Sequence, residues 1–171
     1  MEGLRLEIPK AEHKKDVMDF RQEFVNAKER VSGGAGLEQA ENYEDWLCHK
    51  YTPHYGQVDE IVFLAYDEQK NLVGISDIRL ETNDYILTFA GQIGYSVRPS
   101  QRRKGYASEI LRLTLEQAAG YGWRRALITC NETNLASARV IEKNGGVLEK
   151  VIPHPGFPDV RQYYINFKKN V

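Results

Sequence analysis

The chain has 171 residues, which is enough for one domain with a substantial core and too few for two comfortable ones. Apolar residues make up 42% and charged residues 27%, and the formal net charge of −1 excludes the basic balance of a dedicated nucleic-acid binder. No apolar run approaches the roughly 20 residues that span a bilayer, and the N-terminus lacks a signal-peptide apolar region. We therefore expect one domain over residues 1–171, in the cytoplasm, with Cys48 and Cys130 as reduced thiols and neither a membrane nor a nucleic-acid partner. The sequence leaves open whether the chain forms a homodimer.

The first third of the chain predicts a strand followed by two helices. Leu4–Ile8 alternates apolar and polar residues, which is typical of a half-buried strand, and Pro9 ends it. Residues 11–30 repeat apolar positions at a spacing of three to four, which predicts a helix. A glycine-rich break at 32–36 separates it from a shorter helix that we expect over 37–50.

The rest of the chain predicts six strands and two helices. The strands are expected over 61–66, 72–80, 93–97, 126–130, 147–152 and 160–167, and the helices over 105–121 and 135–144. The resulting order is β-α-α-β-β-β-α-β-α-β-β, an α/β domain around one mixed sheet. Because a strand–helix–strand crossover is right-handed and parallel, the order predicts local parallel pairing around the helix 105–121.

The segment 97–108 joins an apolar strand to a long amphipathic helix through a cationic loop. Its four cationic side chains are Arg98, Arg102, Arg103 and Lys104. Gly105 stands at the turn, so backbone N–H groups can converge at a helix N-terminus that carries partial positive charge. These features predict a phosphate-binding corner, although its spacing differs from the P-loop and dinucleotide-binding patterns.

The run Arg102-Arg103-Lys104-Gly105-Tyr106-Ala107 resembles the Arg/Gln-x-x-Gly-x-Gly/Ala signature of the GNAT superfamily of acyl-CoA-dependent N-acetyltransferases. A strand precedes this signature, and a strand, the pair Asn131 and Asn134, and a helix follow it in the expected order. Within 91–100 and 141–146 the chain is similar to a bacterial group of mostly uncharacterised, predicted acetyltransferases. The resemblance implies a GNAT-like mixed, largely antiparallel sheet with a parallel splayed pair.

The resemblance also implies where acetyl-CoA, the expected co-substrate, would bind. Backbone groups near Tyr95 and Val97 would hold the pantetheine arm, and the Val97 N–H would polarise the thioester carbonyl as an oxyanion donor. Asn134 would meet the arm from the other side, although capping the next helix is an equally good explanation for this residue. The expected cofactor-binding set is Tyr95, Val97, Arg102, Arg103, Lys104, Gly105, Tyr106, Ala107, Ser108, Asn134 and Ser137. No metal is expected.

The proton chemistry is the open part of the resemblance. The family often has an acid tyrosine where this chain has Ile141, so Tyr106, Tyr163 or Tyr164 would have to act as the acid, and we select Tyr164. Gln92 stands where some members carry a basic glutamate, and it can orient an amine or a water but cannot take a proton. Glu81 and Asp77 are the nearest acidic candidates for the general base, although an exposed strand carboxylate is the better interpretation of each. A chain of water molecules is an alternative candidate for the base.

Several further side chains carry weaker signals. Cys48, His49 and His54 lack a complete zinc-ligand spacing, and Cys130 is more typical of a core thiol than of a nucleophile. An acceptor pocket or the core would explain the aromatic residues before the sheet equally well. These aromatic residues are Tyr43, Trp46, Tyr51 and Tyr55. His154, in a late proline-rich loop, would border the same pocket.

The sequence thus favours an N-acetyltransferase that moves acetyl from acetyl-CoA to a primary amine of a small molecule or protein by direct attack in a ternary complex. The missing acid tyrosine favours an alternative, a non-catalytic acyl-CoA-binding sensor. A third interpretation is a nucleic-acid-binding module, against which the near-zero net charge counts. It would use Arg98, Arg102, Arg103, Lys104, Arg124 and Arg125.

Overall fold

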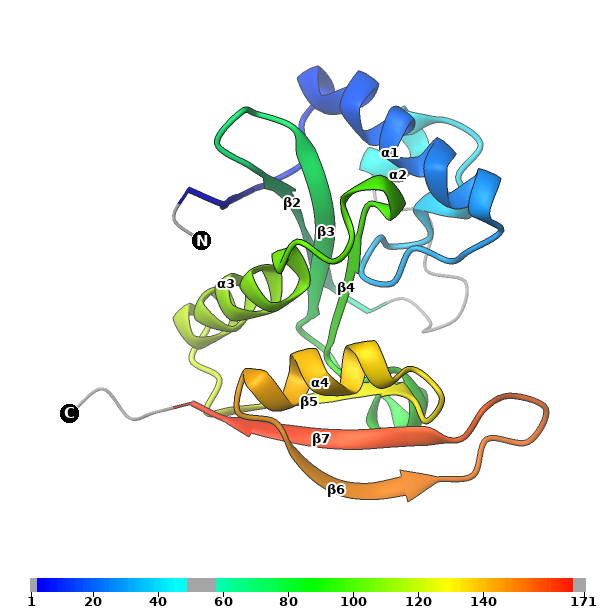
Figure 1. The fold of residues 1–171 in the computed structure, drawn as a ribbon, viewed down its shortest axis with the longest axis vertical. Helices are drawn as coiled ribbons and strands as arrows, with labels where there is room; N and C mark the ends of the chain where they lie inside the picture. The colour runs from blue at the N-terminus through cyan, green and yellow to red at the C-terminus, as the bar shows by residue number, and fades with distance from the viewer. Residues whose placement is uncertain (1–2, 49–57, 168–171) are drawn as a thin grey trace.

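The strands form two separate sheets in the computed structural model, which describes residues 3–48 and 58–167 (Figure 1). The first sheet has the order β1-β2-β3-β4, with β1 (Arg5–Glu7), β2 (Glu60–Tyr66), β3 (Leu72–Arg79) and β4 (Ile93–Val97). The second has the order β5-β7-β6, with β5 (Arg125–Asn131), β6 (Val147–Ile152) and β7 (Val160–Asn166). Neighbouring strands within both sheets are antiparallel.

Four α-helices cover these sheets. They are α1 (Lys14–Ala27), α2 (Tyr43–Leu47), α3 (Tyr106–Gly120) and α4 (Leu135–Lys143). Helices α1 and α2 bury Phe20, Phe24 and Trp46 against Leu64 and Ile75 of the first sheet. Helices α3 and α4 share a second core with both sheets, and this core contains Leu111, Ile141, Ile78, Ile128 and Tyr163. Each face of the first sheet therefore has its own helical cover, as an α/β domain requires.

The two sheets are joined by hydrogen bonds at Gln92, directly before the N-terminal end of β4. The Gln92 N–H donates to the Leu127 carbonyl at 2.7 Å, and the Leu127 N–H donates back to Gln92 Oε1 at 3.0 Å. Beyond this point β4 runs across the direction of β5 (Figure 1), and no ladder joins the two strands. The predicted α/β class with a splayed pair of strands is confirmed. The parallel pairing expected around α3 is limited to the bonds between Gln92 and Leu127, because β4 and β5 diverge beyond them.

The strand and helix expectations hold with three differences. Helix α1 ends at Ala27 because Lys28 adopts a left-handed conformation, with φ 55°. The helix predicted over 37–50 is a 3-10 turn, η2 (Leu37–Gln39), followed by the short α2, which the Asn42 side chain caps. The predicted loop after β3 contains a π-helical turn, η3 (Ile86–Ala90), too short for periodicity to reveal. Two further 3-10 turns are η1 (Ala11–His13) and η4 (Pro99–Gln101).

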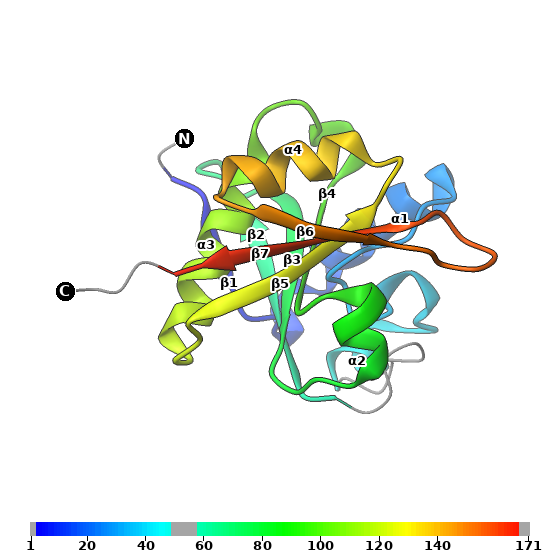
Figure 2. The same ribbon diagram turned by 90° about the horizontal axis from the view of Figure 1, so that it is seen from below.

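Figure 2 shows the second sheet with α4 on one side and the η3 segment on the other. The η3 segment is tied to this sheet by polar contacts, since Gln162 Nε2 donates to the carbonyls of Leu87 and Thr88. Thr129 Oγ1 donates to the Phe89 carbonyl at 2.8 Å. The place where the backbones of β4 and β5 diverge beyond Gln92 is called the opening below, and α3, α4 and the η3 segment lie around it (Figures 1 and 2). None of the described helices is long and apolar enough to cross a membrane.

Candidate functional site

The corner between β4 and α3 presents a row of unpaired backbone donors. Arg103 and Gly105 both have left-handed backbones, with φ of 63° and 84°. The first helical hydrogen bond runs from the Glu109 N–H to the Gly105 carbonyl, so the N–H groups of the preceding turn have no helical acceptor. They point out of the helix N-terminus, where the macrodipole adds positive charge, and this arrangement suits a phosphate.

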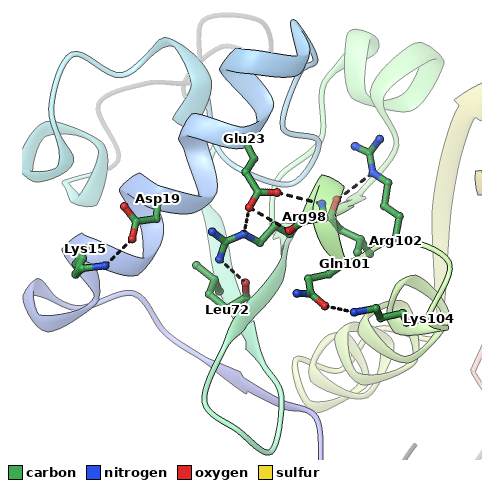
Figure 3. A network of polar contacts seen from close by, with 10 residues as sticks. Lys15, Asp19, Glu23, Leu72, Arg98, Gln101, Arg102 and Lys104 are labelled. Atoms are coloured by element: carbon green, nitrogen blue, oxygen red, sulfur yellow. Dashed lines mark hydrogen bonds and ion pairs between the residues drawn. The ribbon is translucent and has the colours of Figure 1, made fainter.

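The cationic side chains of this corner have different partners (Figure 3). Arg102 forms a two-pronged ion pair with Glu29, with Nη1 3.1 Å from Oε1, and its Nε donates to the Val97 carbonyl at 3.3 Å. Lys104 donates to Gln101 Oε1 at 2.7 Å. Among the described residues Arg103 has no hydrogen bond or ion pair. Arg103 is therefore the side chain that is free to meet a phosphate, whereas Arg102 is held against α1.

Glu23 of α1 anchors the loop before the corner. Its carboxylate accepts from Arg98 Nε at 2.5 Å, the Ser100 N–H at 3.0 Å and Ser100 Oγ at 3.1 Å (Figure 3). Burial would raise the pKa of Glu23, but the bonds from Ser100 and Arg98 outweigh it and hold the pKa below its usual range. The carboxylate therefore stays ionised at neutral pH and fixes the loop to α1.

Strand β4 presents a free backbone edge toward the opening. Gln92 and Arg98 bond to β3, through Arg79 N–H to Gln92 O and Arg98 N–H to Val73 O, both at 2.9 Å. Bonding alternates along an antiparallel strand, so the N–H and carbonyl groups of Tyr95 and Val97 face away from β3. By this alternation the two N–H groups lie on the edge of β4 that leads from the α3 corner to the opening.

The other side of the opening is the first turn of α4. Asn134 caps this helix by accepting the Ser137 N–H at 3.1 Å, as the capping explanation predicted. The Tyr95 ring crosses from β4, and its hydroxyl lies 2.8 Å from Ser137 Oγ. The structure therefore brings together three predicted site residues from two elements.

A groove of about 320 Å³ lies between the start of α3 and the end of α4. Its lining residues are Gly105, Ser108, Glu109, Arg112, Lys143 and Asn144. Arg112 is paired with Glu109 and Glu116, whereas no described residue forms an ion pair with Lys143. Lys143 is a candidate anion ligand that the sequence reasoning missed; its signal was a cation in the last turn of α4 directly before Asn144-Gly145.

The predicted catalytic side chains do not gather at the opening. Gln92 is used by the junction between the sheets, and Glu81 is exposed in a bend after β3. Tyr163 donates to Glu142 at 3.0 Å, and Tyr164, next in the strand, faces the other side of β7 with the Arg125 guanidinium 4.4 Å from its ring. Tyr106 packs against the core around Val73 and Val97.

A buried carboxyl pair lies on the α1 side of the first sheet. Asp77 is 1% exposed, forms an ion pair with Arg79 at 3.2 Å and accepts the Gly94 N–H at 2.7 Å. The interpretation of Asp77 as an exposed carboxylate is therefore wrong. Burial, and then the charge of Asp77 beside it, raise the pKa of Glu60 to about 8, against a weaker opposite effect of Arg79. At pH 7 Glu60 therefore keeps its proton, and neither Glu60 nor Arg79 was singled out by sequence patterns.

The weaker sequence signals resolve mainly as packing. Tyr43 and Trp46 are 2% and 1% exposed, so they belong to the core, while Tyr51, Tyr55, His49 and His54 lie outside the described residues. In the described part of the chain no group of three or more His, Cys, Asp or Glu could hold a metal ion. His154 stacks between Phe89 and Phe157, with ring centroids 4.1 and 4.6 Å away.

The sequence model of the family described as "Acetyltransferase (GNAT) domain" matches residues 5–147. The chain belongs to this family of acetyl-CoA-dependent N-acetyltransferases, and its co-substrate is acetyl-CoA. The fold and the donor row at α3 agree with this assignment, because a pyrophosphate needs such a corner.

Solved structures of acetyltransferases share the fold. RimL, a ribosomal-protein alpha-N-acetyltransferase in complex with coenzyme A, superposes with a TM-score of 0.72 at 19% identity, over 97% of this chain and 95% of that one. A Salmonella typhimurium acetyltransferase that modifies the N-terminal serine of a ribosomal protein gives 0.67 at 19%, over 98% and 97%. A Vibrio cholerae spermidine N-acetyltransferase with coenzyme A and spermine gives 0.66 at 20%, over 97% and 96%. No curated protein matches the chain by sequence.

Proposed function

We propose that the protein transfers acetyl from acetyl-CoA to a primary amine by direct attack in a ternary complex. The observation that carries the proposal is the continuity of the α3 corner with the free edge of β4. One end of this path offers a phosphate site, and the rest offers backbone donors and acceptors for an amide-containing arm. The acetyl-CoA-binding domain is proposed to span the whole chain, residues 1–171, working in the cytoplasm.

The corner residues have distinct proposed roles. The N–H groups of 103–108 hold the pyrophosphate, and Arg103 adds charge. Arg102 positions the loop through Glu29 and Val97 rather than binding the phosphate directly. Lys143 in the groove beside Gly105 serves the second phosphate site of the cofactor.

The oxyanion donor is proposed to be an N–H of the free β4 edge. The Val97 N–H remains the sequence-based prediction, but Val97 lies next to the corner, where Arg102 contacts its carbonyl. The long pantetheine arm places a thioester further along the strand from its pyrophosphate. The Tyr95 N–H, one ladder step further, is therefore the better-placed donor.

The acceptor is proposed to be the amine of a polyamine or of a protein N-terminus, because similar folds act on both classes. The alternative of a non-catalytic acyl-CoA sensor draws support from Ile141, which is fully buried and offers no proton. Both readings require acetyl-CoA, and neither requires nucleic acid, a membrane or a metal. Whether two copies assemble is a separate question for a sedimentation experiment.

Two measurements test the proposal in sequence. Acetyl-CoA should raise the unfolding temperature by mass action. ATP, a nucleotide without a pantetheine arm, should raise it less. Release of free thiol should then follow addition of spermidine or of a peptide with a free N-terminus, but not of the N-blocked peptide. Stabilisation without thiol release from either amine class would favour the sensor, and no stabilisation would overturn both.

A further inference from the structure

The polar atoms at the opening form one small cluster in apolar surroundings. The Tyr95 hydroxyl contacts Ser137 Oγ at 2.8 Å and lies 3.4 Å from the Ser137 carbonyl. Cys130, at the end of β5, is buried in the core against which the Tyr95 ring packs. Around them are Ile93, Ile141 and Ala138, which are all buried. Buried polar side chains normally have a hydrogen-bond partner or a functional role.

Tyr95 joins the two halves of the molecule at this point. Its ring packs against both the α3–α4 core and the smaller core around Val97. Its own backbone N–H and carbonyl face the opening, while its hydroxyl reaches the first turn of α4. The Tyr95 residue therefore spans from the free edge of β4 to the first turn of α4, the two walls between which the pantetheine arm is proposed to lie.

We propose that the Tyr95 hydroxyl, positioned by Ser137, is the hydrogen-bond donor to the departing coenzyme A thiolate. This inference rests on the proposed function. In the reaction the amine nitrogen bonds to the thioester carbonyl carbon, the carbon–sulfur bond breaks, and its electron pair leaves on sulfur. The amine loses its proton to water, and the thiolate later takes one from water. The tyrosine keeps its own proton and lowers the energy of the charged sulfur.

The surroundings of the hydroxyl agree with a donor that does not ionise. Burial holds the pKa of Tyr95 above its usual range, and the bond to Ser137 offsets this only in part. The titratable and charged groups nearby are Cys130 of β5, Glu142 of α4, and Arg161 and Tyr163 of β7. Glu142 is bonded to Tyr163, so neither competes for the Tyr95 hydroxyl. Ser137 Oγ can donate its proton to the Tyr95 hydroxyl oxygen, which leaves the single tyrosine proton free for the thiolate.

The role differs from that of Tyr163 and Tyr164, the candidates named from the sequence. Tyr163 is fully buried with its hydroxyl committed to Glu142, and Tyr164 faces the other side of β7. Ile141 is in the core and has no proton to give. Among the described tyrosines of this region, Tyr95 alone combines a position on the free β4 edge with a hydroxyl at α4.

The decisive experiment measures the acidity of the coenzyme A thiol while it is bound, and it needs no acceptor amine. Thiolate absorbance in the ultraviolet is followed against pH for coenzyme A and, as a blank for protein groups, for desulfo-coenzyme A. The variants are Tyr95→Phe and Ser137→Ala. Tyr121→Phe, at an exposed tyrosine beyond α3, is the matched control.

The pKa of the bound coenzyme A thiol should be about one unit lower in the wild type and in Tyr121→Phe than in Tyr95→Phe. Ser137→Ala should fall between them, because the hydroxyl remains but loses its anchor. Tyr95→Phe should also slow thiol release about tenfold or more with unchanged affinity for coenzyme A. An identical thiol pKa in wild type and Tyr95→Phe would overturn this inference alone, whereas failure of the wild type to bind coenzyme A would overturn the proposed function.

Discussion

Arg102 and Arg103 are neighbours in the phosphate corner with opposite surroundings. Arg102 is held by Glu29 and the Val97 carbonyl, and its guanidinium lies 5.7 Å from the Phe24 ring centroid. The bond to Glu29 raises the pKa of Arg102 and lowers that of Glu29. Arg103 is exposed, and nothing among the described residues competes for its charge. The same residue type is therefore held by a partner in one position and left available to a ligand in the next.

We expect the two alanine variants to separate these roles. Arg103→Ala should weaken coenzyme A binding by about tenfold, the value of one charged hydrogen bond, and leave the free energy of unfolding unchanged. Arg102→Ala should cost about 1 kcal/mol of stability, since the ion pair is exposed. Isothermal titration with coenzyme A and chemical denaturation give the two quantities. A large loss of affinity in Arg102→Ala with full stability would contradict the assignment.

Glu60 predicts an unusual dependence of stability on pH. Its carboxyl pKa is about 8 in the folded protein against 4.5 for an ordinary glutamate, so the folded state prefers the protonated form. The stabilisation is complete below pH 4.5 and is lost as the pH rises through 8, by a few kcal/mol at most. The Gln side chain of Glu60→Gln cannot ionise. The free energy of unfolding of this variant, measured by urea denaturation, should therefore rise relative to that of the wild type between pH 6 and 9. Glu81→Gln, at an exposed carboxylate, should follow the wild-type curve.

At the scale of the element, helix α3 depends on the glycine before it. Gly105 is the N-cap with φ 84°, a conformation that costs a residue with a Cβ about 1 kcal/mol or more. Gly120 ends the same helix, and a Cβ there would meet no atom within 4 Å.

Gly105→Ala should therefore lower the unfolding temperature and weaken coenzyme A binding, because it distorts the donor row. Gly120→Ala should raise stability by up to about 1 kcal/mol and leave binding unchanged. Thermal unfolding with and without coenzyme A measures both effects. Equal behaviour of the two variants would mean that Gly105 has no special backbone role.

The elements could be predicted where the pattern is local. Helix α3 and strand β4 follow from apolar spacing, and the corner between them follows from Gly105 beside clustered cations. The partners of that corner could not be predicted, because Glu29 and Arg102 are 73 residues apart in the chain. The contact between Tyr95 and Ser137 spans 42 residues and depends on how the two sheets diverge. Local periodicity carries no information on either.

At the scale of the whole molecule, the cations do not form one basic surface. Arg98 and Arg102 are neutralised by Glu23 and Glu29 of α1. Arg124 and Arg125 follow the far end of α3, a helix of 15 residues and thus roughly 22 Å long. The six cations that would serve a nucleic-acid module are therefore split between two ends of a helix. This distribution favours a compact anion such as a pyrophosphate over an extended polyanion.

The opening between the sheets exists because β4 and β5 are joined at one residue. Gln92 provides both a backbone donor and a side-chain acceptor to Leu127, a residue that is only 1% exposed. The site therefore depends on a junction that lies outside it. The bonds between Gln92 and Leu127 hold the free edge of β4 and the first turn of α4 at a fixed separation.

Gln92→Leu tests this dependence. It keeps the size of the side chain but leaves the Leu127 N–H without its acceptor, which should cost about 1 to 3 kcal/mol. Gln69→Leu, in the exposed turn between β2 and β3, is the control and should change stability little. Hydrogen exchange of the Leu127 amide should accelerate in Gln92→Leu only, and coenzyme A affinity should fall because the two walls of the opening are no longer held in register. Unchanged exchange at Leu127 would show that the sheets are held together by the apolar core around Ile128 and Tyr163, with Gln92 contributing little.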